Sequence, residues 1–327
     1  MTPITKTILT EFEVRKTGKQ KRAFRQWLTP ILQKNGWTVR EEKGAFGTRN
    51  LVIGDLDRAK VIYTAHYDTC VRLPFPNFIT PKSIPIYVLY QIVLTIAILV
   101  ACFAASILAA VIARMIHPGL TLAGYYVGLY GVLVLLLAGP ANPHNANDNT
   151  SGVTAVVELA LLMPPELRDK CAFVLFDLEE AGLLGSSAFV KKHKHVKKNT
   201  LLVNMDCVSD GETMLFCFRR DSRKETDRFR AAFIQDSRIR PEFLTKNYVY
   251  PSDQIHFDRG VGVSAMCSTK RGLLYMNRIH TPRDTVYCEE NIAWLVEGCI
   301  RLAGNIGKSK CPDLRPGILL YQLTASS

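Results

Sequence analysis

The sequence predicts an α/β domain with a mostly parallel central sheet, interrupted by a pair of long hydrophobic helices. Two observations predict it. Short β-rich runs alternate with helical patterns over most of the 327 residues, and one stretch of the chain contains two long runs without a charged residue. A chain of this length can bury a full core in one large domain or in two smaller ones, so length alone does not choose between them.

The regular elements follow from the spacing of apolar residues. Residues 19–37 place Phe24, Leu28 and Leu32 at helical spacing among basic residues, which predicts an amphipathic helix. The expected strands cover residues 37–40, 50–53, 60–63, 171–176, 201–204 and 214–218. The expected later helices cover residues 152–163, 183–192, 221–233 and 289–306. Strands that alternate with helices in this way are typical of a parallel sheet.

The hydrophobic region does not fit that alternation. Residues 84–113 and 120–138 contain no charged side chain, and a short link with Arg114 and His117 joins them. Each run is long enough to cross a hydrocarbon core of ~30 Å as a helix. We therefore expect residues 84–138 to form a transmembrane hairpin, with residues 1–83 and 139–327 together forming one domain. The alternative is a pair of buried helices, or a dimerisation hairpin, in a soluble protein.

Charge and cysteine usage indicate the compartment. The formal net charge of +12 suits an anionic membrane surface, a nucleic acid or a basic cytosolic face. The basic run 191–198 has no interleaved aromatic residues, so we expect a solvated helix end and no nucleic-acid partner. Nine cysteines without CxxC spacing argue against a disulfide framework and fit a reducing compartment. With no signal-peptide pattern at the start, we expect an integral membrane protein whose catalytic domain is cytoplasmic.

Candidate metal ligands follow several of the expected strands. His66 and Asp68 come after the strand at 60–63, two residues apart and hence on one face of an extended segment. A metal-binding histidine is commonly oriented by such a carboxylate, although a His-x-Asp pair often occurs by chance. Asp148 precedes an expected helix, where it could be an N-cap or a ligand that bridges two ions.

Acidic residues and a second histidine complete the set. Glu179 and Glu180 follow the strand at 171–176, where buried carboxylates need a proton, a partner or a metal. The alternative is that they are only acidic residues at the N-terminus of a helix. Asp206 follows the strand at 201–204, and His280 lies in a loop before the last helix. The carboxyl ends of strands form the ligand crevice of open α/β sheets, so these residues are expected to meet.

The order and wording of these motifs resemble the zinc peptidases of clan MH, family M28, which include bacterial leucyl aminopeptidases, aminopeptidase Y and glutamate carboxypeptidase. The matching segments are TAHYDT, DNTSG, FDLEEAGLLGS, NMD, SDQIHF and HTPRDT, which span residues 64–285 and so cover most of the chain apart from the hydrophobic hairpin. The resemblance implies a three-layer α/β/α fold, the zinc-dependent exopeptidase fold.

The resemblance also implies two Zn²⁺ ions and a role for each matching residue. His66, Asp148 and Asp206 would hold one ion, while Asp148, Glu180 and His280 would hold the other. Glu179 would act as general base towards a metal-bridging water or hydroxide, and Asp68 would steady His66. The expected activity is that of a membrane-anchored aminopeptidase acting on peptides. The alternative is a non-catalytic or cyclase-like membrane scaffold with the same fold.

Two further expectations concern the surroundings of the metals. The family commonly has Ser-Asp-His where this chain has Ser252, Asp253 and Gln254, and Tyr250 could supply a hydrogen bond to the transition state. The hairpin enters the chain between Asp68 and Asp148. Only about ten residues of at most ~3.3 Å each separate Ala138 from Asp148, so the site is expected within ~30 Å of the bilayer surface. The oligomeric state does not follow from the sequence.

Overall fold

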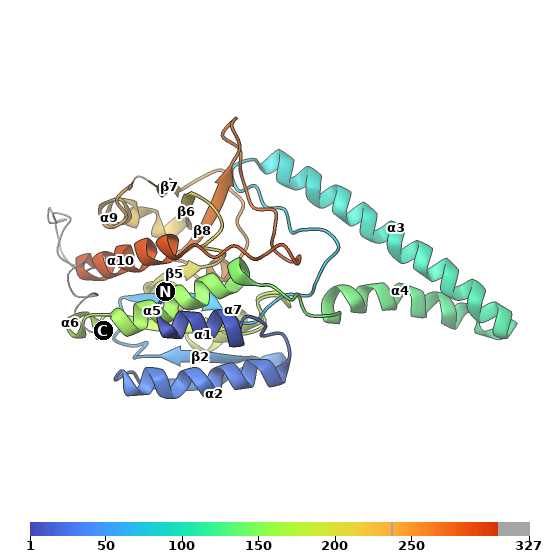
Figure 1. Cartoon of the computed structure of the whole chain (residues 1–327), viewed down its shortest axis with the longest axis horizontal. Helices are drawn as coiled ribbons and strands as arrows, with labels where there is room; N and C mark the ends of the chain where they lie inside the picture. The colour runs from blue at the N-terminus through green and yellow to red at the C-terminus, as the bar shows by residue number, and fades with distance from the viewer. Residues whose placement is uncertain (237, 307–327) are drawn as a thin grey trace.

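The computed structural model describes residues 1–236 and 238–306 and contains one mixed sheet (Figure 1). The strands lie in the order β1-β2-β4-β3-β5-β8-β6-β7, and β9 pairs with β8. Their bounds are β1 (Val39–Lys43), β2 (Arg49–Ile53), β3 (Val61–His66), β4 (Cys171–Phe176), β5 (Leu201–Met205), β6 (Thr213–Phe218), β7 (Arg240–Leu244), β8 (Gly260–Ser268) and β9 (Leu274–Tyr275). Four of the seven pairings along that order are parallel, and they include the central run β4-β3-β5-β8.

Helices cover both faces of the sheet. Their bounds are α1 (Pro3–Glu11), α2 (Gly18–Lys34), α3 (Ile84–Ile116), α4 (Thr121–Ala138), α5 (Gly152–Leu162), α6 (Pro165–Arg168), α7 (Leu184–Lys192), α8 (Lys194–Asn199), α9 (Thr226–Ala232) and α10 (Glu289–Asn305). Alternate residues of β3 face opposite cores: Tyr63 packs with α2, α5 and α10, while Ile62 packs with Phe189 of α7 and Val196 of α8. The three-layer α/β/α fold is therefore confirmed.

Some strands and helices were not predicted from the sequence, because the spacing and type of their residues give a weak or misleading signal. The strand β8 contains Gly260 and Gly262, which lower β propensity, yet it pairs with β5, β6 and β9. The helix α1 is short, and its N-cap is Thr2, whose hydroxyl accepts a hydrogen bond from the backbone nitrogen of Thr5. The first expected helix ends at Lys34 and not at residue 37, because Gly36 adopts a left-handed φ of +91°.

The two hydrophobic helices project from the domain as a hairpin (Figure 1). They pack closely on each other: a Cβ added to Gly128 of α4 would lie 2.3 Å from the carbonyl oxygen of Ala105 in α3. Gly124 makes a similar approach to Ala109, so the pair forms the small-residue spacing typical of membrane helix packing. Most of the outer surface is exposed and apolar, which excludes the alternative of two helices buried in the domain. By length and composition, both helices could cross a membrane.

Candidate metal centre

His66 is the last residue of β3, at the carboxyl end of the parallel strands. Its ring is buried, and Nδ1 lies 3.1 Å from the backbone carbonyl oxygen of Asp68. A proton on Nδ1 would donate to that carbonyl and leave the lone pair of Nε2 free to bind a metal. The Asp68 carboxylate is 3.6 Å from Nδ1, beyond hydrogen-bond distance, so Asp68 contacts the ring through its backbone.

The Asp68 carboxylate instead holds the acidic turn after β4. Its two oxygens accept hydrogen bonds from the backbone nitrogens of Glu179, at 3.0 Å, and Glu180, at 3.2 Å. Two backbone donors favour the ionised carboxylate. Although burial opposes ionisation, the His66 ring and these donors keep the pKa of Asp68 below its usual value. Asp68 therefore links the position of His66 to that of Glu179 and Glu180.

Asp148 lies between the two histidines. Its Oδ1 is 3.3 Å from Nε2 of His66, and its Oδ2 is 3.2 Å from Nε2 of His280. The backbone of this loop is fixed by Asp284, whose carboxylate accepts hydrogen bonds from the nitrogens of Asn147 and Asp148. A carboxylate with one oxygen directed to each histidine has the geometry needed to bridge two metal ions.

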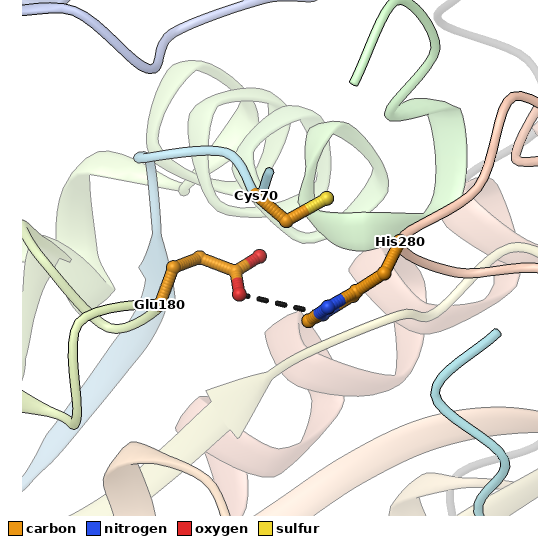
Figure 2. A group of neighbouring side chains, drawn as sticks. All are labelled: Cys70, Glu180 and His280. Carbon is orange, nitrogen blue, oxygen red and sulfur yellow. Dashed lines mark ion pairs between the residues drawn. The ribbon is translucent and has the colours of Figure 1, made fainter. Parts of the chain in front are cut away.

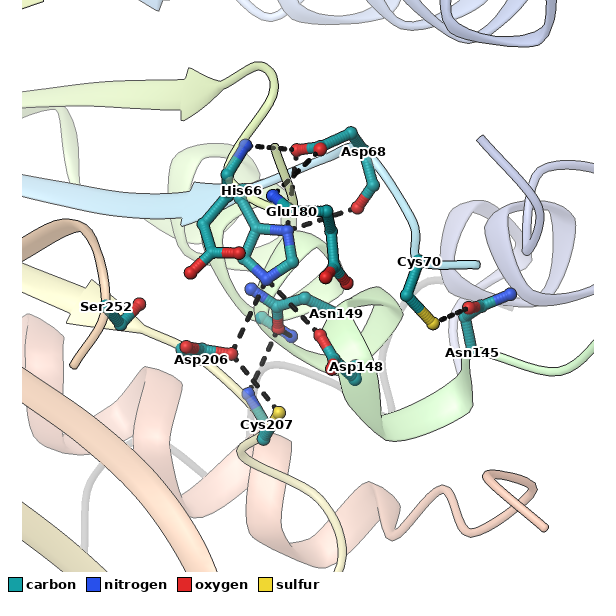
Figure 3. Close-up of polar contacts among 12 residues, drawn as sticks. His66, Asp68, Cys70, Asn145, Asp148, Asn149, Glu180, Asp206, Cys207 and Ser252 are labelled. Carbon is teal, nitrogen blue, oxygen red and sulfur yellow. Dashed lines mark hydrogen bonds and ion pairs between the residues drawn. The ribbon is translucent and has the colours of Figure 1, made fainter. Parts of the chain in front are cut away.

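The remaining donors complete two adjacent groups. On one side, Oδ1 of Asp206 lies 3.6 Å from Nε2 of His66. His66, Asp148 and Asp206 together form a buried group of possible metal ligands (Figure 3). On the other side, Oε2 of Glu180 lies 3.3 Å from Nε2 of His280. The structure thus brings together every candidate from the sequence: His66, Asp68, Asp148, Glu179, Glu180, Asp206 and His280.

Cys70 adds a donor that the sequence analysis missed. Its sulfur, an oxygen of Glu180 and a ring nitrogen of His280 all lie within 4.8 Å of one another (Figure 2). The thiol donates to Oδ1 of Asn145 at 3.4 Å, which keeps it beside the group (Figure 3). A single cysteine without CxxC spacing gave no signal, because only the fold brings it next to His280.

Arg15 is a second residue that the sequence did not indicate. It is completely buried, and its Nε donates to the carbonyl oxygen of Tyr67 at 2.6 Å. Its terminal nitrogens donate to Oγ1 of Thr150 at 3.2 Å. Burial lowers the pKa of Arg15 to about 10 despite nearby carboxylates, which leaves it cationic at neutral pH. Arg15 therefore ties the loop of Asp68 to the loop of Asp148.

The pKa shifts of the site residues indicate that bound cations would stabilise the charged form of the buried carboxylates. Burial, with the nearby Asp148, raises the pKa of Glu180 to about 8, and burial holds the pKa of Glu179 well above its usual range. Burial disfavours a charged His280 ring, but Glu180 and Asp148 outweigh it and raise its pKa to about 9. Oε1 of Glu180 is buried and has no hydrogen-bond partner among the described residues. Histidine, carboxylate and an orphaned oxygen suit zinc, which binds nitrogen and oxygen donors and displaces their protons.

Tyr250 and Gln254 form a supporting pair. The Tyr250 hydroxyl donates to the backbone carbonyl oxygen of Asp206 at 2.9 Å. The Gln254 amide donates to the carbonyl oxygen of Tyr250 at 2.8 Å and accepts from Asn204 at 3.2 Å. In this structure Gln254 is buried and connects β5 to the Tyr250 loop, a role that an amide fills with one donor and one acceptor.

Two cavities meet at the donor groups. A cavity of about 260 Å³ is lined by the carboxylates of Glu179 and Asp206 together with Ile79, Tyr250 and Ile279. A second cavity of about 160 Å³ lies towards the hairpin. Glu180 and His280 line both cavities and so stand between them, whereas His66, Asp148 and Asp206 line the larger cavity alone. A bound molecule could therefore place one part on each side of Glu180 and His280.

Comparisons with known proteins show the family and the fold of the chain. The family model described as peptidase family M28 matches residues 133–296. Aminopeptidase YwaD of Bacillus subtilis strain 168 is 39% identical over 72 residues, which are 21% of this chain and only 16% of that aminopeptidase. The LapA aminopeptidase of Legionella pneumophila has a TM-score of 0.55 at 14% identity, covering 92% of this chain and 67% of LapA. A glutaminyl cyclase of Porphyromonas gingivalis has a TM-score of 0.53 at 17% identity, covering 92% and 95%. The two solved structures show the shared fold.

Proposed function

This chain belongs to peptidase family M28, and from that premise we propose that it is a membrane-anchored, two-zinc aminopeptidase that removes N-terminal residues from peptides. The observation that carries the proposal is the position of Asp148, with one oxygen near His66 and the other near His280. Asp206 would complete one metal site and Glu180 the other. Two zinc ions bound there would polarise the scissile carbonyl and make hydroxide available near neutral pH.

The chain's own residues supply proton transfer and orientation. Glu179 lines the larger cavity, and its carboxylate lies within 4.8 Å of donor atoms of His66 and Glu180, beside the two proposed metal sites. It would take the proton of the attacking water and deliver it to the leaving amine. Asp68 would keep this turn in place through the backbone nitrogens of Glu179 and Glu180. Cys70 could add a soft donor beside Glu180 and His280.

A cyclase is the second candidate, because the glutaminyl cyclase has the same fold over 95% of its length. Family members with that activity are expected to work with one zinc. The position of Asp148, with one oxygen near His66 and the other near His280, favours the peptidase.

The hairpin supports the membrane part of the proposal. The helices α3 and α4 have an exposed apolar surface and pack on each other through Gly124 and Gly128. With both ends on one side, the domain would face the cytoplasm, where the seven described free cysteines outside the hairpin would stay reduced. Peptide substrates would then come from the cytosol or from membrane proteins.

The direct test is the activity of the purified full-length chain in nanodiscs, with and without a chelator. We expect hydrolysis of leucine amide and leucyl dipeptides, no hydrolysis of N-acetylated dipeptides, loss of activity on chelation and recovery on adding zinc. A zinc-loaded protein that cleaves none of the free-amine substrates would contradict the aminopeptidase. Cyclisation of N-terminal glutaminyl peptides without hydrolysis would favour the second candidate.

A further inference from the structure

The smaller cavity joins the donor groups to the foot of the hairpin. Glu180 and His280 line one side of it, and Leu136 and Leu137, at the end of α4, line the other. Lys16, from the segment between α1 and α2, also faces this space. The hairpin is therefore part of a wall next to the proposed metals, in addition to being an anchor.

Backbone hydrogen bonds fix the hairpin foot relative to His280. The nitrogen of Arg72 donates to the carbonyl oxygen of Pro140 at 2.9 Å, directly after α4. The nitrogen of the next residue, Leu73, donates to the carbonyl oxygen of His280 at 2.8 Å. His280 itself has a left-handed φ of +64°, a conformation that needs support from its surroundings. The residues beside the hairpin exit thus help to hold a proposed metal ligand.

The lining of the small cavity suits one apolar side chain and one anion. Val71, Leu73 and Leu136 supply apolar surface. The cavity measures about 160 Å³, and a cavity of about 150 Å³ in another protein accommodates a benzene-sized group. The ammonium group of Lys16 donates to the carbonyl oxygen of Leu137 at 3.3 Å, which leaves it two further protons to donate.

The charges of the two cavities give the direction in which a peptide would bind. The larger cavity has Glu179 and Asp206, which attract the N-terminal ammonium of a substrate. The smaller cavity is lined by Lys16 and by the carboxylates of Asp68 and Glu180. The Asp68 oxygens already accept hydrogen bonds from backbone nitrogens, and Glu180 would bind a metal, so the Lys16 ammonium is the charged group left to attract a substrate carboxylate. A peptide whose first bond lies at the donor groups would therefore direct its amino end into the larger cavity and its next residue into the smaller one.

We infer that the smaller cavity is the subsite for the residue on the carboxyl side of the cleaved bond, and that it selects dipeptides whose second residue is apolar. Leu136 would set the preference for the apolar side chain, and Lys16 would bind the terminal carboxylate. This inference rests on the proposed peptidase activity and adds the substrate class to it.

The test compares substrates that differ only after the cleaved bond. Leucine amide has no second residue, Leu-Gly has no second side chain, and Leu-Leu amide has no terminal carboxylate. For the wild type in nanodiscs, we expect kcat/KM for Leu-Leu to exceed that for Leu-Gly by about tenfold or more. Neutralising the carboxylate, as in Leu-Leu amide, should lower kcat/KM by roughly fivefold, the value of a partly exposed charge pair.

Substitutions at Leu136 and Lys16 test which residue causes each difference in kcat/KM. Leu136→Ala should lower the Leu-Leu to Leu-Gly ratio by about fivefold or more through lost apolar contact, whereas Leu133→Ala, one turn earlier in α4, should leave it unchanged. Lys16→Gln should remove the difference between Leu-Leu and its amide, Lys16→Arg should retain it, and exposed Lys19→Gln is the control. Lys16 is partly exposed, so these variants should fold even if Leu136→Ala does not.

The substrate series separates a wrong subsite from a wrong activity. If the wild type cleaves leucine amide but Leu136→Ala and Lys16→Gln leave both substrate ratios unchanged, the subsite is wrong and the peptidase stands. If the zinc-loaded wild type cleaves neither leucine amide nor any dipeptide, the proposed function itself is wrong.

Discussion

The metal centre buries charged side chains, whereas the hairpin exposes apolar side chains. At the centre, Asp148 is only 4% exposed although it is a carboxylate, and three other acids lie nearby. On the hairpin, Leu99 is 62% exposed although it is a large apolar residue. Buried charge and exposed hydrocarbon are each unfavourable in water.

The contrast indicates what each region is made to bind. Cations would offset the charge of the buried carboxylates, and a bilayer would remove the apolar surface of α3 and α4 from water. The two regions meet at the small cavity, which Glu180 and Leu136 both line.

Glu179→Gln should lower kcat by about 10²- to 10⁴-fold, the usual contribution of a general base. The amide keeps the shape of the side chain, so zinc content and membrane association should match the wild type. The measurement is steady-state hydrolysis of leucine amide together with metal analysis. Glu166→Gln, an exposed acid on α6, is the control and should keep full activity. Unchanged activity in Glu179→Gln would remove this residue from the reaction.

Leu99→Arg, in the middle of α3, should weaken membrane insertion. A charged residue at the centre of a spanning helix costs about 2.5 to 3.5 kcal/mol on insertion scales. The same replacement at Leu162, which is 44% exposed at the end of α5, should have no effect on membrane association. The fraction of protein that resists extraction by alkaline carbonate is the readout. Equal retention of Leu99→Arg and the wild type would argue for a hairpin that stays in water or forms a protein interface.

Asp68→Asn should weaken zinc binding by roughly 10- to 100-fold, the usual cost of losing a residue that orients metal ligands. An amide has only one acceptor oxygen, so it cannot accept hydrogen bonds from both Glu179 and Glu180. Competition with a chromophoric chelator measures the affinity. Asp55→Asn is the control, because the exposed Asp55 accepts from the backbone nitrogens of Asp57 and Arg58 through one oxygen, which an amide retains. Equal loss in both variants would indicate a general effect on folding.

Gly128→Val should destabilise the hairpin by about 1 to 3 kcal/mol through overpacking. The added Cβ would lie 2.3 Å from the carbonyl oxygen of Ala105. Gly131→Val is the matched control, since nothing lies within 4 Å of its added Cβ. Thermal unfolding in detergent should separate the two variants, while zinc affinity should stay the same in both. Equal melting temperatures would show that the close packing of α3 and α4 contributes little.

The sequence predicted the donor residues because each lies at or near the end of a recognisable strand or before a helix. His66 ends β3, and Asp206 directly follows β5, as their neighbouring apolar runs indicate. The sequence could not predict Cys70 or Arg15, since their contacts depend on loops brought together from distant parts of the chain. The strand β8 was missed because its glycines hide a buried, fully paired position in the sheet. The small cavity was also missed, because it requires the relative position of α4 and the His280 loop.

Zinc titration of the chelated full-length chain in nanodiscs measures how many ions the active protein binds. Zinc bound per chain is measured by mass spectrometry alongside the hydrolysis of leucine amide. The two donor groups that share Asp148 predict that activity returns as bound zinc approaches two ions per chain, and that Asp148→Asn stops this recovery. Full activity in chelated, metal-free protein, or tight zinc binding that is unaffected by Asp148→Asn, would contradict the proposed two-zinc site.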